Sequence, residues 1–207
     1  MNENDHTGLI PENTEGKKIT AASSTSFENN VQAAAFYKTA RERLLSVRNW
    51  GSMTGALSAD FALTDEKGIE VDRTPQKGDH FRIDIPGPGS SAGQGYDWAR
   101  VEDIREVSKG ESASIAIMVR PASNPRTDNP DVAHFYSEKS SSTFIVTLEN
   151  KGVTGSIYDR NIQANEETNE PKDKLRNAIA GFGAKRGFSK LQWQALADSI
   201  VELKGHH

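Results

Sequence analysis

The stretch STFIVTLENKGVTGSIYD, residues 142–159, decides the fold class. Apolar residues occupy every second position from Phe144 to Leu148 and again from Val153 to Ile157. The tripeptide Asn150-Lys151-Gly152 lies between the two runs and has the composition of a tight turn. Two-residue alternation is typical of a strand with one buried face, so the stretch predicts an antiparallel hairpin.

The same alternation extends outward over residues 56–162 and predicts seven strands there in all. Besides the hairpin, the alternating runs are residues 57–63, 69–71, 81–85, 99–101 and 113–119. Most are joined by short polar turns, which favours antiparallel meanders over helical crossovers. Two long connections, residues 86–95 and 121–135, interrupt the series, and long loops are common places for function.

Helical periodicity flanks the strand region. Residues 27–47 predict a helix, with a capping box formed by Thr25 and Glu28. After Pro171 the pattern predicts two helices or one kinked helix, the last part beginning at a second capping box of Ser189 and Gln192. Residues 17–22 form a candidate edge strand. Residues 1–16 are expected to be a disordered tail, and residues 17–204 a single α+β domain.

Composition excludes several classes of protein. The net charge of −4 is the wrong sign for a general nucleic-acid binder. The absence of cysteine removes disulfides, thiolate nucleophiles and cysteine metal sites. Every apolar run falls far short of the ~20 residues needed to span a bilayer, and residues 1–6 do not resemble a secretory signal. We therefore expect a cytoplasmic protein with no cofactor, and leave a homodimer open.

The order of elements resembles the helix-grip order of the START-like superfamily, which includes polyketide cyclases and lipid-transfer domains. The features that carry the resemblance are Thr25-Ser26-Phe27 at the helix start, Val47-Arg48-Asn49-Trp50 at its end, and Lys77-Gly78-Asp79 before a strand. It covers residues 17–203. The resemblance implies a sheet of six to seven antiparallel strands wrapped around a C-terminal helix, with an apolar ligand held between them.

Aromatic side chains are the first candidates for the lining of such a cavity, although most aromatic residues simply fill a core. Tyr158 and Arg160 share one face of their predicted strand, while Ile157 and Asp159 share the other. The expected ligand-binding residues are Trp50, Phe61, Phe81, Trp98, Phe144, Tyr158, Arg160 and Phe182.

Motifs with specific chemistry are weak. The glycine-rich segment 87–93 contains Pro88, which has no N–H to offer a phosphate, and a strand follows where a phosphate loop needs a helix. The internal histidines, His80 and His134, lack the short spacing of a zinc site. The acidic segment 128–131 lacks the pattern of a calcium loop.

Three functions remain at this point. The preferred hypothesis is non-catalytic binding of a hydrophobic small molecule or lipid in the cavity. The second is a cyclase, dehydratase or hydrolase that pairs His80 or His134 with Asp97 or Asp159 as acid and base, which requires two of these side chains to meet in one pocket. The third is a protein-interaction domain with a filled core.

Overall fold

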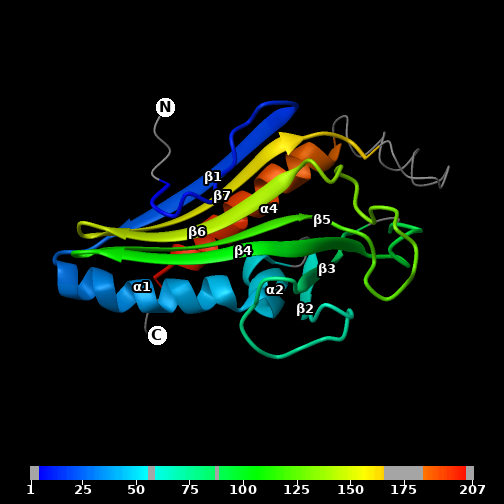
Figure 1. Ribbon diagram of the computed structural model, residues 1–207. Coiled ribbons are helices and arrows are strands. Elements are labelled where there is room, and N and C mark those ends of the chain that lie inside the picture. Colours follow the sequence, from blue (N-terminus) through cyan, green and yellow to red (C-terminus); the bar gives the residue numbers. More distant parts are fainter. Residues whose placement is uncertain (1–4, 56–58, 87–88, 166–183, 204–207) are drawn as a thin grey trace.

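The computed structural model describes residues 5–55, 59–86, 89–165 and 184–203. Within them, seven strands form one antiparallel sheet in the order β1-β7-β6-β5-β4-β3-β2 (Figure 1). The strands are β1 (Lys17–Ser26), β2 (Asp60–Thr64), β3 (His80–Asp84), β4 (Asp97–Lys109), β5 (Ser112–Pro121), β6 (Ser141–Glu149) and β7 (Gly152–Ile162). The helices are α1 (Asn30–Leu45), the 3₁₀ turn η1 (Val47–Asn49), α2 (Trp50–Thr54) and α4 (Ala184–Val201). The α+β helix-grip architecture that the sequence predicted is confirmed.

The hairpin that decided the fold class has the predicted register. Phe144 pairs with Ile157 and Leu148 with Val153 across β6 and β7. Asn150, in the connecting turn, adopts a φ of 54°, a left-handed conformation that asparagine tolerates better than most residues. The first strand in sequence, β1, pairs with the last strand, β7, so these two strands lie side by side at one edge of the sheet.

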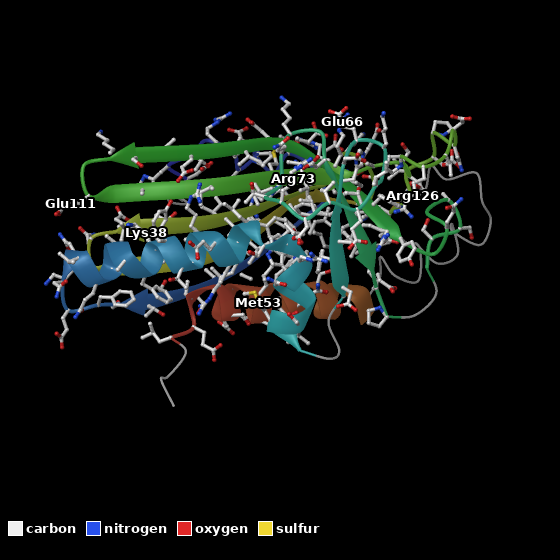
Figure 2. All side chains as sticks on the ribbon, turned by 90° about the horizontal axis from the view of Figure 1, so that it is seen from below. Lys38, Met53, Glu66, Arg73, Glu111 and Arg126 are labelled. Atoms are coloured by element: carbon white, nitrogen blue, oxygen red, sulfur yellow. The ribbon has the colours of Figure 1, made fainter. Side chains whose placement is uncertain are left out.

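Both long helices pack against one face of the sheet. Helix α4 packs against β1 and β7, and α1 packs against β6 and β7. At the far end of the molecule, Glu111 in the β4–β5 turn accepts a hydrogen bond from Asn30 Nδ2 at the start of α1, at 2.6 Å (Figure 2). The apolar residues between these layers form one main core centred on Trp50, Phe81, Phe144 and Ile200, all almost fully buried.

The structure corrects the predicted helix starts. Helix α1 begins at Asn30 with Asn29 as its N-cap, because the Asn29 side chain accepts a hydrogen bond from the Gln32 backbone N–H. Thr25 instead lies in β1, one residue before its end, and its hydroxyl donates to the Val201 carbonyl. Ser189 is not a cap either, because α4 already begins at Ala184 and continues through Gly187. The helix predicted around residues 175–182 falls outside the described residues.

The run at residues 69–71 is not a strand of its own. Glu70 forms only an isolated bridge to Thr64 at the end of β2. Asp65 explains the tight turn, since its side chain accepts hydrogen bonds from the backbone N–H groups of Lys67 and Ile69. The chain therefore returns briefly to the β2 edge and leaves again before β3.

Residues 5–16, expected as part of a tail, have defined contacts on the other face of the sheet. Leu9 is buried there with Ala116 and Ile145. Asp5 accepts hydrogen bonds from the backbone N–H groups of Thr7, Gly8 and Ile10, which gives this short segment an internal turn. Composition alone predicted a tail here, because a single buried leucine, Leu9, and a single hydrogen-bonding carboxylate, Asp5, do not make a pattern that differs from a disordered segment.

Candidate functional site

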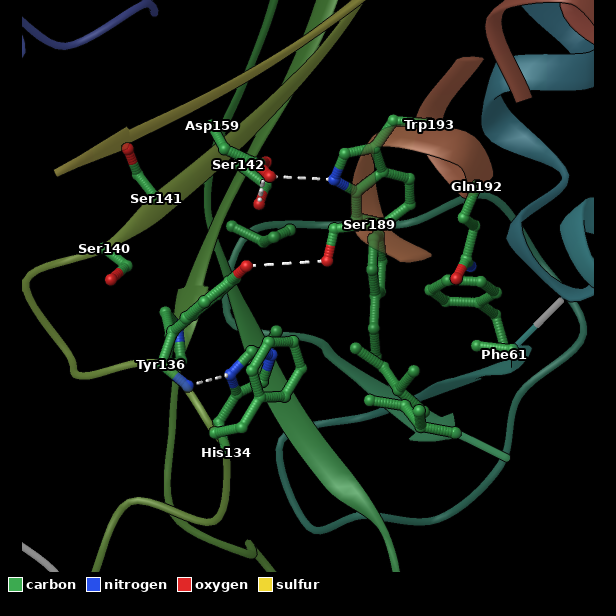
Figure 3. Close-up of a pocket in the computed structure, with 18 of the residues that line it drawn as sticks. Phe61, His134, Tyr136, Ser140, Ser141, Ser142, Asp159, Ser189, Gln192 and Trp193 are labelled. Atoms are coloured by element: carbon green, nitrogen blue, oxygen red, sulfur yellow. Dashed lines mark hydrogen bonds between the residues drawn. The ribbon is translucent and has the colours of Figure 1, made fainter. Parts of the chain in front are cut away.

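A small cavity lies between the inner face of the sheet and helix α4 (Figure 3). Its volume is about 50 Å³. Most of its wall is apolar, and six of the apolar lining residues carry aromatic rings. These apolar residues are Ala59, Phe61, Phe81, Ile83, Ile85, Ala99, Val119, Pro121, Phe135, Tyr136, Phe144 and Trp193.

Asp159 on β7 is the one acidic residue among the described residues that line the cavity. Its carboxylate accepts one hydrogen bond from Ser142 Oγ on β6 at 2.7 Å and one from Trp193 Nε1 on α4 at 2.8 Å (Figure 3). Burial raises the pKa of Asp159 to about 6, partly opposed by these two hydrogen bonds and by the charge of Arg160. The group is therefore a carboxylate at neutral pH, held in surroundings that favour its neutral form.

The segment from His134 to Tyr136 forms a second side of the cavity, at the end of the long connection between β5 and β6. The Tyr136 backbone N–H donates to His134 Nδ1 at 2.9 Å, which fixes that nitrogen as an acceptor. The Tyr136 hydroxyl lies 3.5 Å from Ser189 Oγ, across to α4 (Figure 3). The His134 ring stacks on Phe135 with a centroid distance of 4.5 Å.

Gln192 contributes an unsatisfied amide. It lies on α4 one residue before Trp193, is 7% exposed, and its Nε2 has no hydrogen-bond partner in the described part of the chain. A buried amide without a partner costs free energy, on the order of 1–3 kcal/mol. A water or a ligand oxygen in the cavity would satisfy it.

The cavity is smaller than most small-molecule binding pockets. Pockets for drug-sized ligands usually enclose roughly 300–1,000 Å³, whereas one water needs roughly 10–15 Å³ measured in this way. A volume of about 50 Å³ therefore holds about four waters or a molecule with a handful of non-hydrogen atoms. A lipid chain does not fit this conformation.

Three of the predicted binding residues line this cavity: Phe61, Phe81 and Phe144. Trp50 lies behind them, with its ring centroid 5.4, 5.6 and 4.7 Å from theirs, respectively. Its indole Nε1 donates to the Arg43 and Leu44 carbonyls, so Trp50 connects the end of α1 to the cavity wall.

The other predicted binding residues lie elsewhere. Trp98 packs with Ala92 and Ala133 in a separate cluster. Tyr158 packs with the Leu9 cluster on the opposite face of the sheet, and the Arg160 guanidinium lies 5.1 Å from its ring. The predicted strand parity explains this, because the residues that flank Asp159 must point away from the cavity. Phe182 falls outside the described residues.

Two of the four candidate acid–base residues meet in one cavity, and the other two lie in separate places. His134 and Asp159 line the same cavity. His80 instead lines a groove with Arg100 and Arg120, where burial lowers its pKa. The Asp97 carboxylate accepts a hydrogen bond from the Phe135 backbone N–H at 3.3 Å, behind the cavity wall.

Sequence reasoning missed the contribution of α4, namely Ser189, Gln192 and Trp193. Their spacing of three and four residues places them on one helix face, which was a readable signal. The spacing of Ser189 and Gln192 instead favours a capping box in the sequence alone. Tyr136 was also missed, because nothing in a long loop shows which side chain turns inward.

The described residues contain no group of three or more His, Asp or Glu side chains placed to hold a metal ion. No helix among them is long and apolar enough to span a bilayer.

Comparison with known proteins supports the fold. No protein-family model matches the chain, and no curated protein matches its sequence. The solved structure of the hypothetical protein jhp0584 from Helicobacter pylori is similar over 90% of this chain and 87% of its own, with a TM-score of 0.52 and 10% identity. An identity this low shows a common fold and nothing about activity.

Similar structures also include START-like proteins. Truncated norcoclaurine synthase from Thalictrum flavum aligns over 92% of this chain and 99% of its own, with 8% identity and a TM-score of 0.35. Major latex-like protein 151 from Panax ginseng aligns over 80% and 93%, with 14% identity and a TM-score of 0.33. TM-scores this low carry no functional argument. The element order and sheet topology are nevertheless those that the START-like resemblance implied.

Proposed function

We propose that this protein binds a small, mainly apolar molecule in the cavity between the sheet and α4. The observation that carries the proposal is an apolar, largely aromatic cavity with a few polar groups among its lining residues. This is the usual composition of a small-molecule site, in which apolar walls supply affinity and a few polar groups fix orientation. The cavity volume favours a small molecule over a lipid.

The polar groups of the cavity support a ligand that carries at least one hydrogen-bonding group. The unsatisfied Gln192 Nε2 is a donor without an acceptor. A ligand oxygen placed against it would remove the cost of burying that amide. A purely hydrocarbon ligand would leave the cost in place.

Native mass spectrometry of the purified protein, followed by NMR titration with butan-1-ol, tests this proposal. We expect saturable shifts of the Trp193 indole N–H resonance, because Trp193 lines the cavity. Ala99→Leu places extra methyl groups in the cavity and should abolish the shifts. Ala62→Leu adds the same atoms at a β2 position that does not line the cavity and should preserve them.

Two results would reject this function. One is an absence of saturable binding for every small apolar probe, together with no co-purifying molecule. The other is binding that Ala99→Leu and Ala62→Leu affect equally, which would place the ligand outside the cavity.

A second candidate, acid–base catalysis, has one observation in its favour: His134 and Asp159 line the same cavity. Two titratable groups at one substrate could act as base and acid. The test is a screen of dehydratase, cyclase and hydrolase substrates with the wild type and His134→Gln. Turnover that His134→Gln removes while probe binding persists would favour catalysis over simple binding. The third hypothesis, a protein-interaction domain, requires a filled core. The cavity therefore favours the other two functions.

A further inference from the structure

The cavity wall contains a buried carboxylate, and the described residues that line the cavity include no lysine or arginine beside it. Asp159 is 1% exposed and accepts from two neutral donors, Ser142 Oγ and Trp193 Nε1. A carboxylate offers about four acceptor positions, so two remain for a ligand.

Among the described residues, the basic side chain that acts on Asp159 is directed away from the cavity. Arg160 follows Asp159 on β7, and its Nη1 donates to the carbonyls of Ile19 and Asp159 itself, at 3.1 and 2.9 Å. Its guanidinium therefore lies on the β1 side, next to the Tyr158 ring. It weakly stabilises the Asp159 charge but does not enter the cavity.

The walls around this carboxylate are also suited to a cation. Trp193 contacts Phe144 and Phe61, with ring centroids 5.2 and 6.3 Å apart, and all three rings line the cavity. Aromatic ring faces attract ammonium groups, most strongly where water is excluded. A carboxylate surrounded by aromatic rings favours an amine over an alcohol of the same size, and strongly disfavours an acid.

We infer that the molecule bound in this cavity is a small apolar amine whose protonated nitrogen pairs with the Asp159 carboxylate. The inference rests on the proposed function and adds the chemical class of the ligand to it. The ammonium group would occupy the remaining acceptor positions of Asp159, and a short carbon chain would lie among Phe61, Phe81 and Phe144. Burying either charge alone would cost desolvation free energy. The attraction between the ammonium group and the carboxylate would offset this cost for both charges.

Three probes of equal size test the charge directly: n-butylamine, butan-1-ol and butyrate. Each is titrated near pH 8 into the full chain, with the Trp193 indole N–H resonance as reporter and Trp193→Phe to assign it. We expect n-butylamine to bind about tenfold more tightly than butan-1-ol, the advantage of one charge-assisted contact, and butyrate not to bind.

Asp159→Asn removes the charge and keeps an oxygen that Ser142 or Trp193 can contact. The variant should lose the preference for the amine while still binding butan-1-ol. Asp198→Asn removes an exposed charge from the same helix, α4, and should leave the preference intact. Thermal unfolding of both variants checks that each is folded.

A pH series on the wild type gives the same information without substitution. Burial raises the pKa of Asp159 to about 6, so near pH 5 the carboxyl is mostly neutral and the preference for the amine should shrink. Among the described residues, the other charged or titratable groups that face it are Arg160 on β7, and His134 and Tyr136 across the cavity, while the described lining residues of α4 are uncharged. His134→Gln should leave the midpoint of this pH dependence near that of Asp159.

The outcomes separate the two levels of the proposal. Equal affinity for amine and alcohol in the wild type, with binding intact, would overturn the amine assignment and retain apolar-ligand binding. An amine preference that persists in Asp159→Asn would also overturn it. Binding of none of the probes would reject the site as a whole.

Discussion

The Asp159 carboxylate on β7 accepts a hydrogen bond from the Trp193 indole on α4, at 2.8 Å, across the interior of the protein. A second donor, Ser142 Oγ, holds the same carboxylate from β6. The contact joins sheet and helix at the cavity, so the group that would recognise a ligand also positions one wall of the site.

Asp159 should make stability depend on pH in a direction opposite to that of most carboxylates. Its pKa rises from an ordinary 3.8 to about 6 on folding, so the native state binds the proton more tightly than the unfolded state. The group is neutral in both states only well below pH 4, stability falls as the pH rises from about 4 to about 6, and the full cost is present above about pH 6. Relative to Asp159→Asn, the wild type should lose on the order of 2–3 kcal/mol of unfolding free energy between these limits.

Urea denaturation of both proteins near pH 4 and pH 7.5 measures that difference. Subtracting the unfolding free energy of the variant from that of the wild type cancels the contribution of other carboxyls. Asp5 and Glu106 are examples, because their lowered pKa values make stability rise with pH. A difference that is flat with pH would show that Asp159 does not titrate as described.

Gly155 allows α4 to approach the sheet closely. A Cβ added there would lie 3.2 Å from both the Ala197 carbonyl oxygen and Ile200 Cγ2. Gly155→Ala should therefore push α4 outward and cost about 1–3 kcal/mol of unfolding free energy. Gly152→Ala, on the same strand, meets its nearest atom at 3.5 Å, an ordinary contact, and should be near neutral in the same denaturation experiment. Equal effects of the two substitutions would contradict close packing at Gly155.

Arg43 on α1 caps the C-terminal end of α4. Its Nη1 donates to the carbonyls of Ser199, Ile200 and Glu202 at 3.2, 3.0 and 2.7 Å. Arg43→Ala should cost about 1–2 kcal/mol and speed amide exchange in the last turn of α4, because helix-end carbonyls lose their partner. Arg41→Ala, which breaks a partly exposed pair with Glu106, should cost less than about 1 kcal/mol and leave α4 exchange unchanged.

Leu9 tests whether the N-terminal segment belongs to the domain. It is 5% exposed against Ala116 and Ile145 on the second face of the sheet. Leu9→Ala should destabilise the protein by about 2–4 kcal/mol in thermal or urea unfolding. Val31→Ala, at a position that is 80% exposed, is the matched control and should change little. Indistinguishable variants would mean that the segment contributes nothing to stability.

The sequence predicted the architecture well because each strand carries its own signal. The alternation from Phe144 to Leu148 and from Val153 to Ile157 specified both the hairpin and which side chains face inward. The same parity correctly separated Asp159 from Tyr158 and Arg160. Capping was less readable, since Thr25 and Ser189 have suitable side chains but hydrogen-bond to elements far away in sequence.

The candidate site was only partly predictable, because it is assembled from distant segments. Phe61, Phe81 and Phe144 were expected to line a cavity, and they do. Their partners on α4 and in the His134–Tyr136 segment depend on where a helix crosses the sheet and how a long loop returns. Neither is encoded in a local pattern. The cavity volume depends on how closely the helices pack against the sheet. Strand alternation shows which side chains face inward and does not determine this volume.

The most direct test of a ligand-binding cavity is a crystal structure under xenon pressure, because xenon enters apolar cavities without needing the natural ligand. We predict a xenon atom among Phe61, Phe144 and Trp193 in the wild type, and none there in Ala99→Leu. Wild-type crystals with no xenon between the sheet and α4 would show that this interior is filled, and would contradict the proposed binding site.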